Sequence, residues 1–265
     1  MTEWSAMQVR SYAKINWSLR VTGRRADGFH DLETVFQAVS LYDTLTFTPA
    51  ETLTLTCDDP SIPTDGTNLV LRAARALGAP PVAIHLGKRI PAGGGLGGGS
   101  SNAATTLVTL ARMFALNTPL AELALSLGSD VPFFLAGGTA YATGRGEVLT
   151  ALPHAAGTPL LLLMPEERVL TKEAFAGLRR FSAPIGIERA SRLLAEDLVN
   201  DFEESVFAKL PRLAALKQRL IAAGAAWAGM SGSGSTIAGR FTSAAARDAA
   251  RAEFGDVRAV ACETI

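Results

Sequence analysis

The residues with the clearest chemical potential are the glycines of "PAGGGLGGGSSNAA", residues 91–104. Six of the seven residues at positions 93–99 are glycine, and an amphipathic run of helical spacing follows directly. A glycine loses more conformational entropy on folding than any other residue, so six glycines in this segment indicate a function in the folded protein. Glycine backbone that opens onto a helix N-terminus presents unhindered N–H groups and the positive end of the helix dipole. The pattern predicts a phosphate-sized anion site. Ser100, Ser101 and Asn102 stand where N-cap residues belong; their role is either capping alone or, through the serine hydroxyls, also contact with phosphate or Mg²⁺.

Other glycine-rich loops fit this stretch less well. Gly93, Gly95 and Gly98 satisfy the G-x-G-x-x-G pattern of dinucleotide-binding loops, but any polyglycine run does so. A Walker A loop ends in Gly-Lys-Ser/Thr, and residues 91–111 contain no lysine. A flexible linker is also glycine-rich, yet this segment joins a predicted strand to a predicted helix. The H-R-D and D-F-G motifs of protein kinases are absent from the sequence.

Two charged residues stand beside apolar runs. Lys14 precedes Ile15 near the start of a predicted strand, where a lysine is usually a solvated surface group. A partner carboxylate would explain it better, and Asn16 shares its face because strand side chains alternate. Asp130, in "LGSDVPFF", stands where aspartate commonly makes a turn or a cap. With a phosphate site upstream, Asp130 is a candidate general base.

The composition excludes several classes of protein. The 265 residues are 48% apolar, and positive and negative side chains balance at 25 each, so there is no basic excess for nucleic acid. No signal peptide is recognisable, and the longest apolar run, "PLLLLMP", is far too short for a membrane span. Two distant cysteines fit a reducing compartment, and three scattered histidines support no structural zinc site. We expect a cytoplasmic protein with a small-molecule partner, no nucleic acid and no membrane; the oligomeric state stays open.

The elements that position these residues follow from periodicity. Strands are predicted over residues 14–22, 30–39, 43–48 and 82–90, with a turn at Asp27-Gly28, and "GTAYATGRGEVL" is predicted as a hairpin. Helices are predicted over residues 67–77 (with Thr67 as cap and Gly78 as stop), after the glycines, and over 119–128. The Pro- and Gly-containing residues 152–159 are the candidate linker. The second half reads β-α-β-β-α-β, the order of a ferredoxin-like α+β layer.

Four stretches together resemble one family. "PAGGGLGGGSSNAA", "AKINWSLRVTGRRADGFHDLETVFQ", "LGSDVPFFLAGGTAYATGRGEVL" and "MSGSGSTIAG" occur in the order found in the GHMP kinases and span almost the whole chain. The resemblance implies a two-domain α+β fold. An N-terminal ribosomal-protein-S5-like domain is expected over residues 1–155, and a C-terminal ferredoxin-like domain over residues 156–265.

The same resemblance implies an activity. It is the ATP- and Mg²⁺-dependent phosphorylation of the 2-hydroxyl of a methylerythritol unit linked to cytidine diphosphate, in the non-mevalonate route to isoprenoid precursors. It makes Lys14 and Asp130 catalytic. It assigns ATP binding to eleven consecutive residues: Pro91, Ala92, Gly93, Gly94, Gly95, Leu96, Gly97, Gly98, Gly99, Ser100 and Ser101.

The resemblance also assigns the acceptor site. Asn16, Phe29, His30, Thr171 and Phe175 are the implied substrate-binding residues, with two aromatic rings around the cytosine and the histidine at its edge. Family members commonly carry tyrosine where this chain has Phe29, so stacking is retained and a hydroxyl contact is lost. For an isolated aromatic or histidine, ordinary packing is the more common role.

The diphosphate of the acceptor needs donors. Arg24 and Arg25 in "GRRADG" are the candidates, although exposed arginines are usually solvated.

Two alternatives stay open. Another GHMP kinase, for mevalonate or homoserine, would share the glycine loop but would have no reason to carry "ADGFH". A non-catalytic nucleotide-binding regulator would have the fold without chemistry, and loss of Lys14 or Asp130 would mark it. Both residues are present.

Overall fold

The computed structural model describes residues 5–153 and 156–265. The chain forms two compact units, each assembled from several stretches of sequence. The first contains residues 5–13, 42–92 and 97–136, and the second contains residues 14–41, 93–96 and the described part of 137–265. Two long strands, β1 (Met7–Arg24) and β2 (His30–Pro49), have residues in both units. The boundary predicted after residue 155 stays a prediction, and residues 154–155 of the predicted linker lie outside the described residues.

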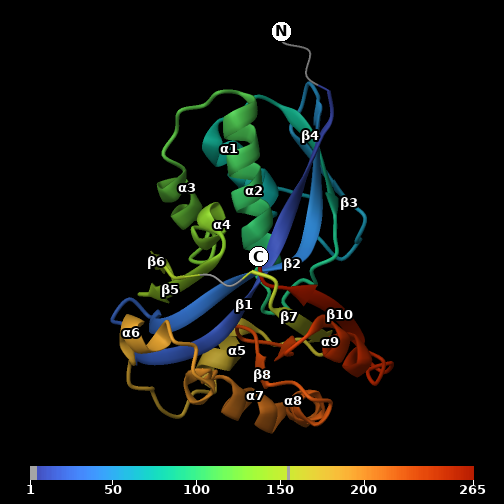
Figure 1. The fold of residues 1–265 in the computed structure, drawn as a ribbon. Helices are drawn as coiled ribbons and strands as arrows, with labels where there is room; N and C mark the ends of the chain where they lie inside the picture. Colours follow the sequence, from blue (N-terminus) through green and yellow to red (C-terminus); the bar gives the residue numbers. More distant parts are fainter. Residues whose placement is uncertain (1–4, 154–155) are drawn as a thin grey trace. The chain divides into compact units, whose positions relative to one another are not determined.

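The first unit packs helices against one part of a six-stranded sheet (Figure 1). The end of β2 pairs antiparallel with β4 (Val82–Gly87), which pairs in parallel with β3 (Thr54–Cys57). Helices α1 (Leu69–Leu77) and α2 (Gly98–Met113) lie side by side, and both contact α3 (Leu120–Leu127). The short α4 (Phe133–Ala136) contacts α2. Leucine, isoleucine and alanine side chains from these elements form one buried core.

The start of α1 differs by one residue from the prediction. Asn68 is the N-cap, and its side-chain oxygen accepts a hydrogen bond from the Val70 amide at 2.9 Å. Thr67 instead bonds the Asp65 carboxylate at 2.6 Å, so its prediction as the cap is wrong. Both residue types suit this position, and the hydrogen bond to Asp65 commits Thr67 elsewhere. The stop at Gly78 is confirmed by its left-handed φ of 67°.

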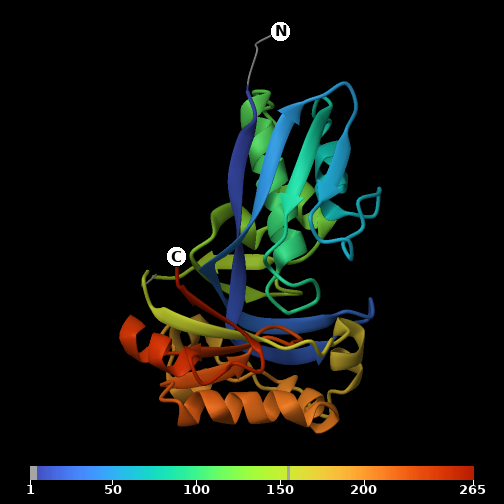
Figure 2. The same ribbon diagram turned by 90° about the vertical axis from the view of Figure 1, so that its right-hand side faces the viewer.

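The second unit contains the ferredoxin-like layer. Strands β7 (Pro159–Met164), β8 (Trp227–Met230), β9 (Ile237–Arg240) and β10 (Arg258–Glu263) form a sheet of order β10-β7-β9-β8. Helix α8 (Pro211–Ala222) contacts β8 and β9, and α9 (Ala244–Arg251) contacts β7 and β10; α8 is the long orange helix of Figure 2. The remaining helices are α5 (Thr171–Ala176), α6 (Gly186–Ala190), η1 (Ala195–Asp197) and α7 (Glu203–Lys209). This order confirms the β-α-β-β-α-β prediction.

The second unit also holds the predicted hairpins. Strands β5 (Thr139–Thr143) and β6 (Val148–Ala151) pair antiparallel, and β5 pairs with β2. Gly28 makes the turn between β1 and β2 with a φ of 87°. Ile15, Trp17, Leu19 and Val21 are buried as their period-two spacing predicts. Within the described residues, no helix is long and apolar enough to cross a membrane.

Candidate active site

The glycine loop has an alternating backbone. The φ angles of Gly93, Gly95 and Gly97 are 72°, 76° and 68°, whereas the residues between them keep negative φ. The left-handed region is costly for residues with a Cβ atom, so these positions require glycine. Alternation of this kind turns successive N–H groups toward one concavity, which makes a nest for an anion.

Hydrogen bonds hold the carbonyl side of this loop. Within the second unit, the Leu96 carbonyl accepts from the Lys14 amide at 3.0 Å. The Gly95 carbonyl accepts from the Ser231 hydroxyl at 2.9 Å, and the Gly94 carbonyl from the Thr236 amide at 3.3 Å. The amides of residues 93–96 donate to no group in the described part of the chain. The loop therefore offers four unengaged N–H donors on a backbone that is fixed through its carbonyls.

Helix α2 begins earlier than the capping prediction required. Its N-cap is Gly97, which makes no side-chain capping bond, so the prediction that Ser100, Ser101 and Asn102 are N-caps is wrong. Glycine at this position supplies the positive φ that the serines could adopt only with strain. Ser101 and Asn102 lie inside the helix and are 1% and 2% exposed. The uncapped helix start leaves its first amides and its positive dipole end open to an anion.

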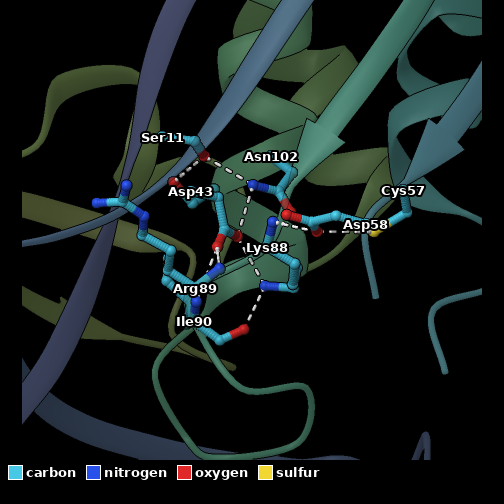
Figure 3. A network of polar contacts seen from close by, with 9 residues as sticks. Ser11, Asp43, Cys57, Asp58, Lys88, Arg89, Ile90 and Asn102 are labelled. Atoms are coloured by element: carbon cyan, nitrogen blue, oxygen red, sulfur yellow. Dashed lines mark hydrogen bonds and ion pairs between the residues drawn. The ribbon is translucent and has the colours of Figure 1, made fainter. Parts of the chain in front are cut away.

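The Asn102 side chain points into a buried network in the first unit (Figure 3), and Ser101 joins this network through its hydroxyl. The Ser101 hydroxyl lies 2.7 Å from that of Ser11, and the Asn102 amide donates to Ser11 at 3.0 Å and to Asp43 at 3.1 Å. Ser100 is half-buried and stays outside this network. Of the three polar residues, Ser100 alone keeps a hydroxyl available for a phosphate contact.

Lys14 is a buried lysine, 4% exposed, and not a solvated surface group. Its Nζ donates to Asn16 Oδ1 at 2.6 Å and lies 5.1 Å from the centre of the Phe36 ring. Asn16, 2% exposed, donates in turn to the Thr34 hydroxyl at 2.7 Å. The prediction that Lys14 and Asn16 share one face of the strand is confirmed. Thr34 anchors the asparagine, a role that no sequence motif indicated.

Asp130 lies in the first unit, between the end of α3 and the start of α4. It is half-buried, and Val131 and Phe133 beside it are 0% and 1% exposed. The carboxylate is thus carried on a short turn whose apolar neighbours are anchored in the core. Lys14 belongs to the other unit.

Aromatic side chains gather in the second unit around His30. Its imidazole stacks on Phe175, with ring centres 4.5 Å apart and 17° between planes, and Phe175 contacts Phe202 edge-on at 4.8 Å. Burial, and then the charge of Arg24, lower the pKa of His30 below its ordinary 6.5. At neutral pH the imidazole is therefore uncharged, with one donor and one acceptor nitrogen.

Phe29 is 51% exposed, an unusual state for a phenylalanine. The Arg145 guanidinium lies 4.7 Å above its ring, at the turn of the β5–β6 hairpin. Sequence reasoning missed Arg145; its signal was a cation between two glycines in "TGRGE". Arg25, by contrast, is paired with Asp27 at 3.1 Å and Asp31 at 3.2 Å and so stabilises the β1–β2 turn.

Thr171 begins α5, and its hydroxyl lies 3.1 Å from that of Ser233. Ser233 belongs to the loop between β8 and β9, the same loop whose Ser231 bonds Gly95. Thr171 is thereby joined to the segment that supports the glycine loop. Both contacts lie within the second unit.

Family models match two parts of the chain: GHMP kinases N terminal domain over residues 68–138, and GHMP kinases C terminal over residues 175–257. A 4-diphosphocytidyl-2-C-methyl-D-erythritol kinase from Chlorobium luteolum is 41% identical over 93% of this chain and 92% of its own. One from Salinibacter ruber is 42% identical over 90% of this chain and 91% of its own.

Solved structures of two kinases are also similar to this chain. A crystal structure of 4-(cytidine 5'-diphospho)-2C-methyl-D-erythritol kinase, 35% identical, superposes with a TM-score of 0.87 over 97% of this chain and 99% of that one. Homoserine kinase from Cytophaga hutchinsonii, 18% identical with a TM-score of 0.72 over 100% of this chain and 96% of its own, shares the fold alone.

Proposed function

The chain belongs to the family of 4-diphosphocytidyl-2-C-methyl-D-erythritol kinases, within the GHMP kinases, and we propose that it phosphorylates the 2-hydroxyl of that acceptor. ATP supplies the phosphoryl group, and the products are ADP and the 2-phosphate. The observation that carries the proposal is the glycine loop, with four unengaged amides beside an uncapped helix start. Phosphoryl transfer requires mainly positioning and electrostatic support, and this loop supplies both to a triphosphate.

Mg²⁺ fits the donor set of this chain. In the part of the chain that the structure describes, no three His, Cys, Asp or Glu side chains come together as a metal site. Mg²⁺ is commonly held by one or two carboxylates together with substrate phosphates and waters, so a dedicated cage is not required. The Ser100 hydroxyl is one oxygen ligand that the chain offers, and the bound ion would neutralise phosphate charge.

Asp130 is assigned the role of general base, which orients and accepts the proton of the 2-hydroxyl. Lys14 is assigned the stabilisation of the alkoxide as it forms. A buried ammonium group held by Asn16 is already oriented, so it needs no reorganisation during the reaction.

The aromatic group around His30 is assigned to the cytidine half of the acceptor. A neutral imidazole can hydrogen-bond the base edge, and the face of Phe29 opposite Arg145 is free to take the ring by stacking. Arg145, engaged with the Phe29 ring and with Glu147 at 3.6 Å, is assigned the diphosphate. This assignment replaces Arg25, because two carboxylates already hold that side chain.

The experiment that tests the proposal is ADP release from Mg-ATP by the purified protein. The cytidyl acceptor, mevalonate and homoserine are offered in parallel. ADP release with the cytidyl acceptor alone supports the proposal. Release with another acceptor would keep the kinase and overturn the acceptor assignment, and ATP binding with no release would favour a regulator.

A further inference from the structure

A carboxylate outside the assigned active site gathers an unusual number of donors. Asp43 is 0% exposed. Its oxygens accept from Lys88 Nζ at 2.6 Å, from the Arg89 and Ile90 amides at 2.7 and 2.8 Å, and from the Asn102 side chain at 3.1 Å. A carboxylate has about four lone-pair sites, so Asp43 is saturated.

These donors flank the glycine loop on both sides. Residues 88–90 lead into it directly from β4, and Asn102 stands in α2, shortly after it (Figure 3). Ser11 extends the same network to β1 through Asn102 and Ser101. One carboxylate in the first unit therefore joins the entry to the loop with the helix that follows it.

Lys88 adds two contacts to the junction, by which we mean the connection of residues 88–90 with helix α2 through Asp43. Its ammonium group, 5% exposed at the side chain, is paired with Asp43 and also donates to the Ile90 carbonyl. It lies 3.1 Å from where a Cβ atom on Gly98 would stand. The ion pair thus fills the space directly under the first residue of α2, and its charges cancel locally.

We propose that Asp43 is a positioning residue for ATP: it fixes the separation of residues 88–90 from the start of α2, and so presets the loop between them. This inference rests on the proposed binding of ATP at the loop. Preorganisation of this kind lowers the entropy lost on binding, so its removal weakens ATP binding and leaves acceptor binding intact.

The test is Asp43→Asn, with the KM of each substrate measured separately. The amide retains the shape but presents donors to Lys88 or Asn102, so the junction opens. We expect the KM for ATP to rise about ten- to hundredfold, as for a misplacement of about 1 Å, with the acceptor KM within about twofold of wild type. Asp197→Asn is the matched control, because Asp197 is 2% exposed, is ion-paired with Arg189, and lies in the second unit.

Asn102→Ala covers the case in which Asp43→Asn does not fold. This substitution removes the hydrogen bond from the Asn102 side chain to Asp43 and leaves the Asp43–Lys88 ion pair intact. We expect about a fivefold rise in the KM for ATP. ATP binding is also measured without acceptor, through its effect on thermal unfolding. If wild type does not bind ATP, the proposed function fails together with this inference. If wild type binds ATP and folded Asn102→Ala binds it equally well, or if both substrates weaken alike, Asp43 has no positioning role.

Discussion

The substitution Gly95→Ala examines the glycine loop at the position where the structure is least permissive. A Cβ atom on Gly95 would stand 2.0 Å from the backbone oxygen of Ser231 and 3.2 Å from that of Gly234. Both neighbours are main chain and cannot rotate away. Because Cβ contacts below 3.0 Å are essentially never observed, the loop must move by at least about 1 Å.

The structure supplies a matched control in Gly93→Ala. Gly93 has nearly the same φ as Gly95, but nothing lies within 4 Å of its Cβ position. Both variants therefore incur the left-handed backbone cost of about 1–2 kcal/mol. Only Gly95→Ala also disrupts the hydrogen bond from Ser231, which contributes about 1 kcal/mol.

We expect Gly95→Ala to lose about 2–3 kcal/mol of unfolding free energy, and Gly93→Ala about 1–2 kcal/mol. For activity, a displacement of about 1 Å predicts roughly a hundredfold fall in kcat/KM for ATP, and for Gly95→Ala alone. Urea unfolding and a coupled ADP assay measure the two quantities. Equal losses in the two variants would refute the reasoning, because the clash with Ser231 would then have no consequence.

Three further predictions concern the assigned side chains. Asp130→Asn should retain ATP binding, and its turnover should fall about 10²–10⁴-fold. Unchanged turnover would show that Asp130 is not the general base. Because the pKa of His30 lies below 6.5, acidification charges it late, and the acceptor KM should rise as the pH falls through that lowered pKa. The unfolded chain takes up this proton from about pH 6.5, so folding stability should decline between pH 6.5 and the lowered pKa. An acceptor KM that stays flat while the His30 imidazole becomes charged, as followed by proton NMR, contradicts the assignment. Arg145→Gln should raise the acceptor KM about tenfold or more with the ATP KM unchanged, whereas Arg25→Gln should change neither; equal effects would return Arg25 to the site.

The elements were largely predictable because their signals are local. Ile15, Trp17, Leu19 and Val21 alternate as a strand face must, and Gly78 ends a helix as a left-handed residue does. The glycine loop was predictable as an anion site, because so many glycines directly before a helix have no other evident function. Cys57 and Cys262 are both free thiols, as their separation in sequence indicated.

What the sequence did not reveal depends on partners distant in the chain. The choice of Gly97 over the serines as N-cap follows from a backbone angle, and Ser101 is committed to Ser11, ninety residues away. Asp43 sits in an ordinary strand pattern, and its four donors come from residues 88–102. Arg145 becomes visible only when the hairpin brings it over Phe29. Local sequence patterns do not predict contacts between residues that lie far apart in the chain.

The position of the transferred phosphate tests the central claim most directly. The protein is incubated with Mg-ATP and the cytidyl acceptor, and the product is observed by proton-coupled phosphorus NMR. The 2-carbon of methylerythritol carries no hydrogen, so a phosphate there has no proton three bonds away. We expect a new phosphomonoester signal that is a singlet and whose amount equals that of the ADP formed. A signal split by neighbouring protons, or ADP without a new phosphomonoester, would contradict it.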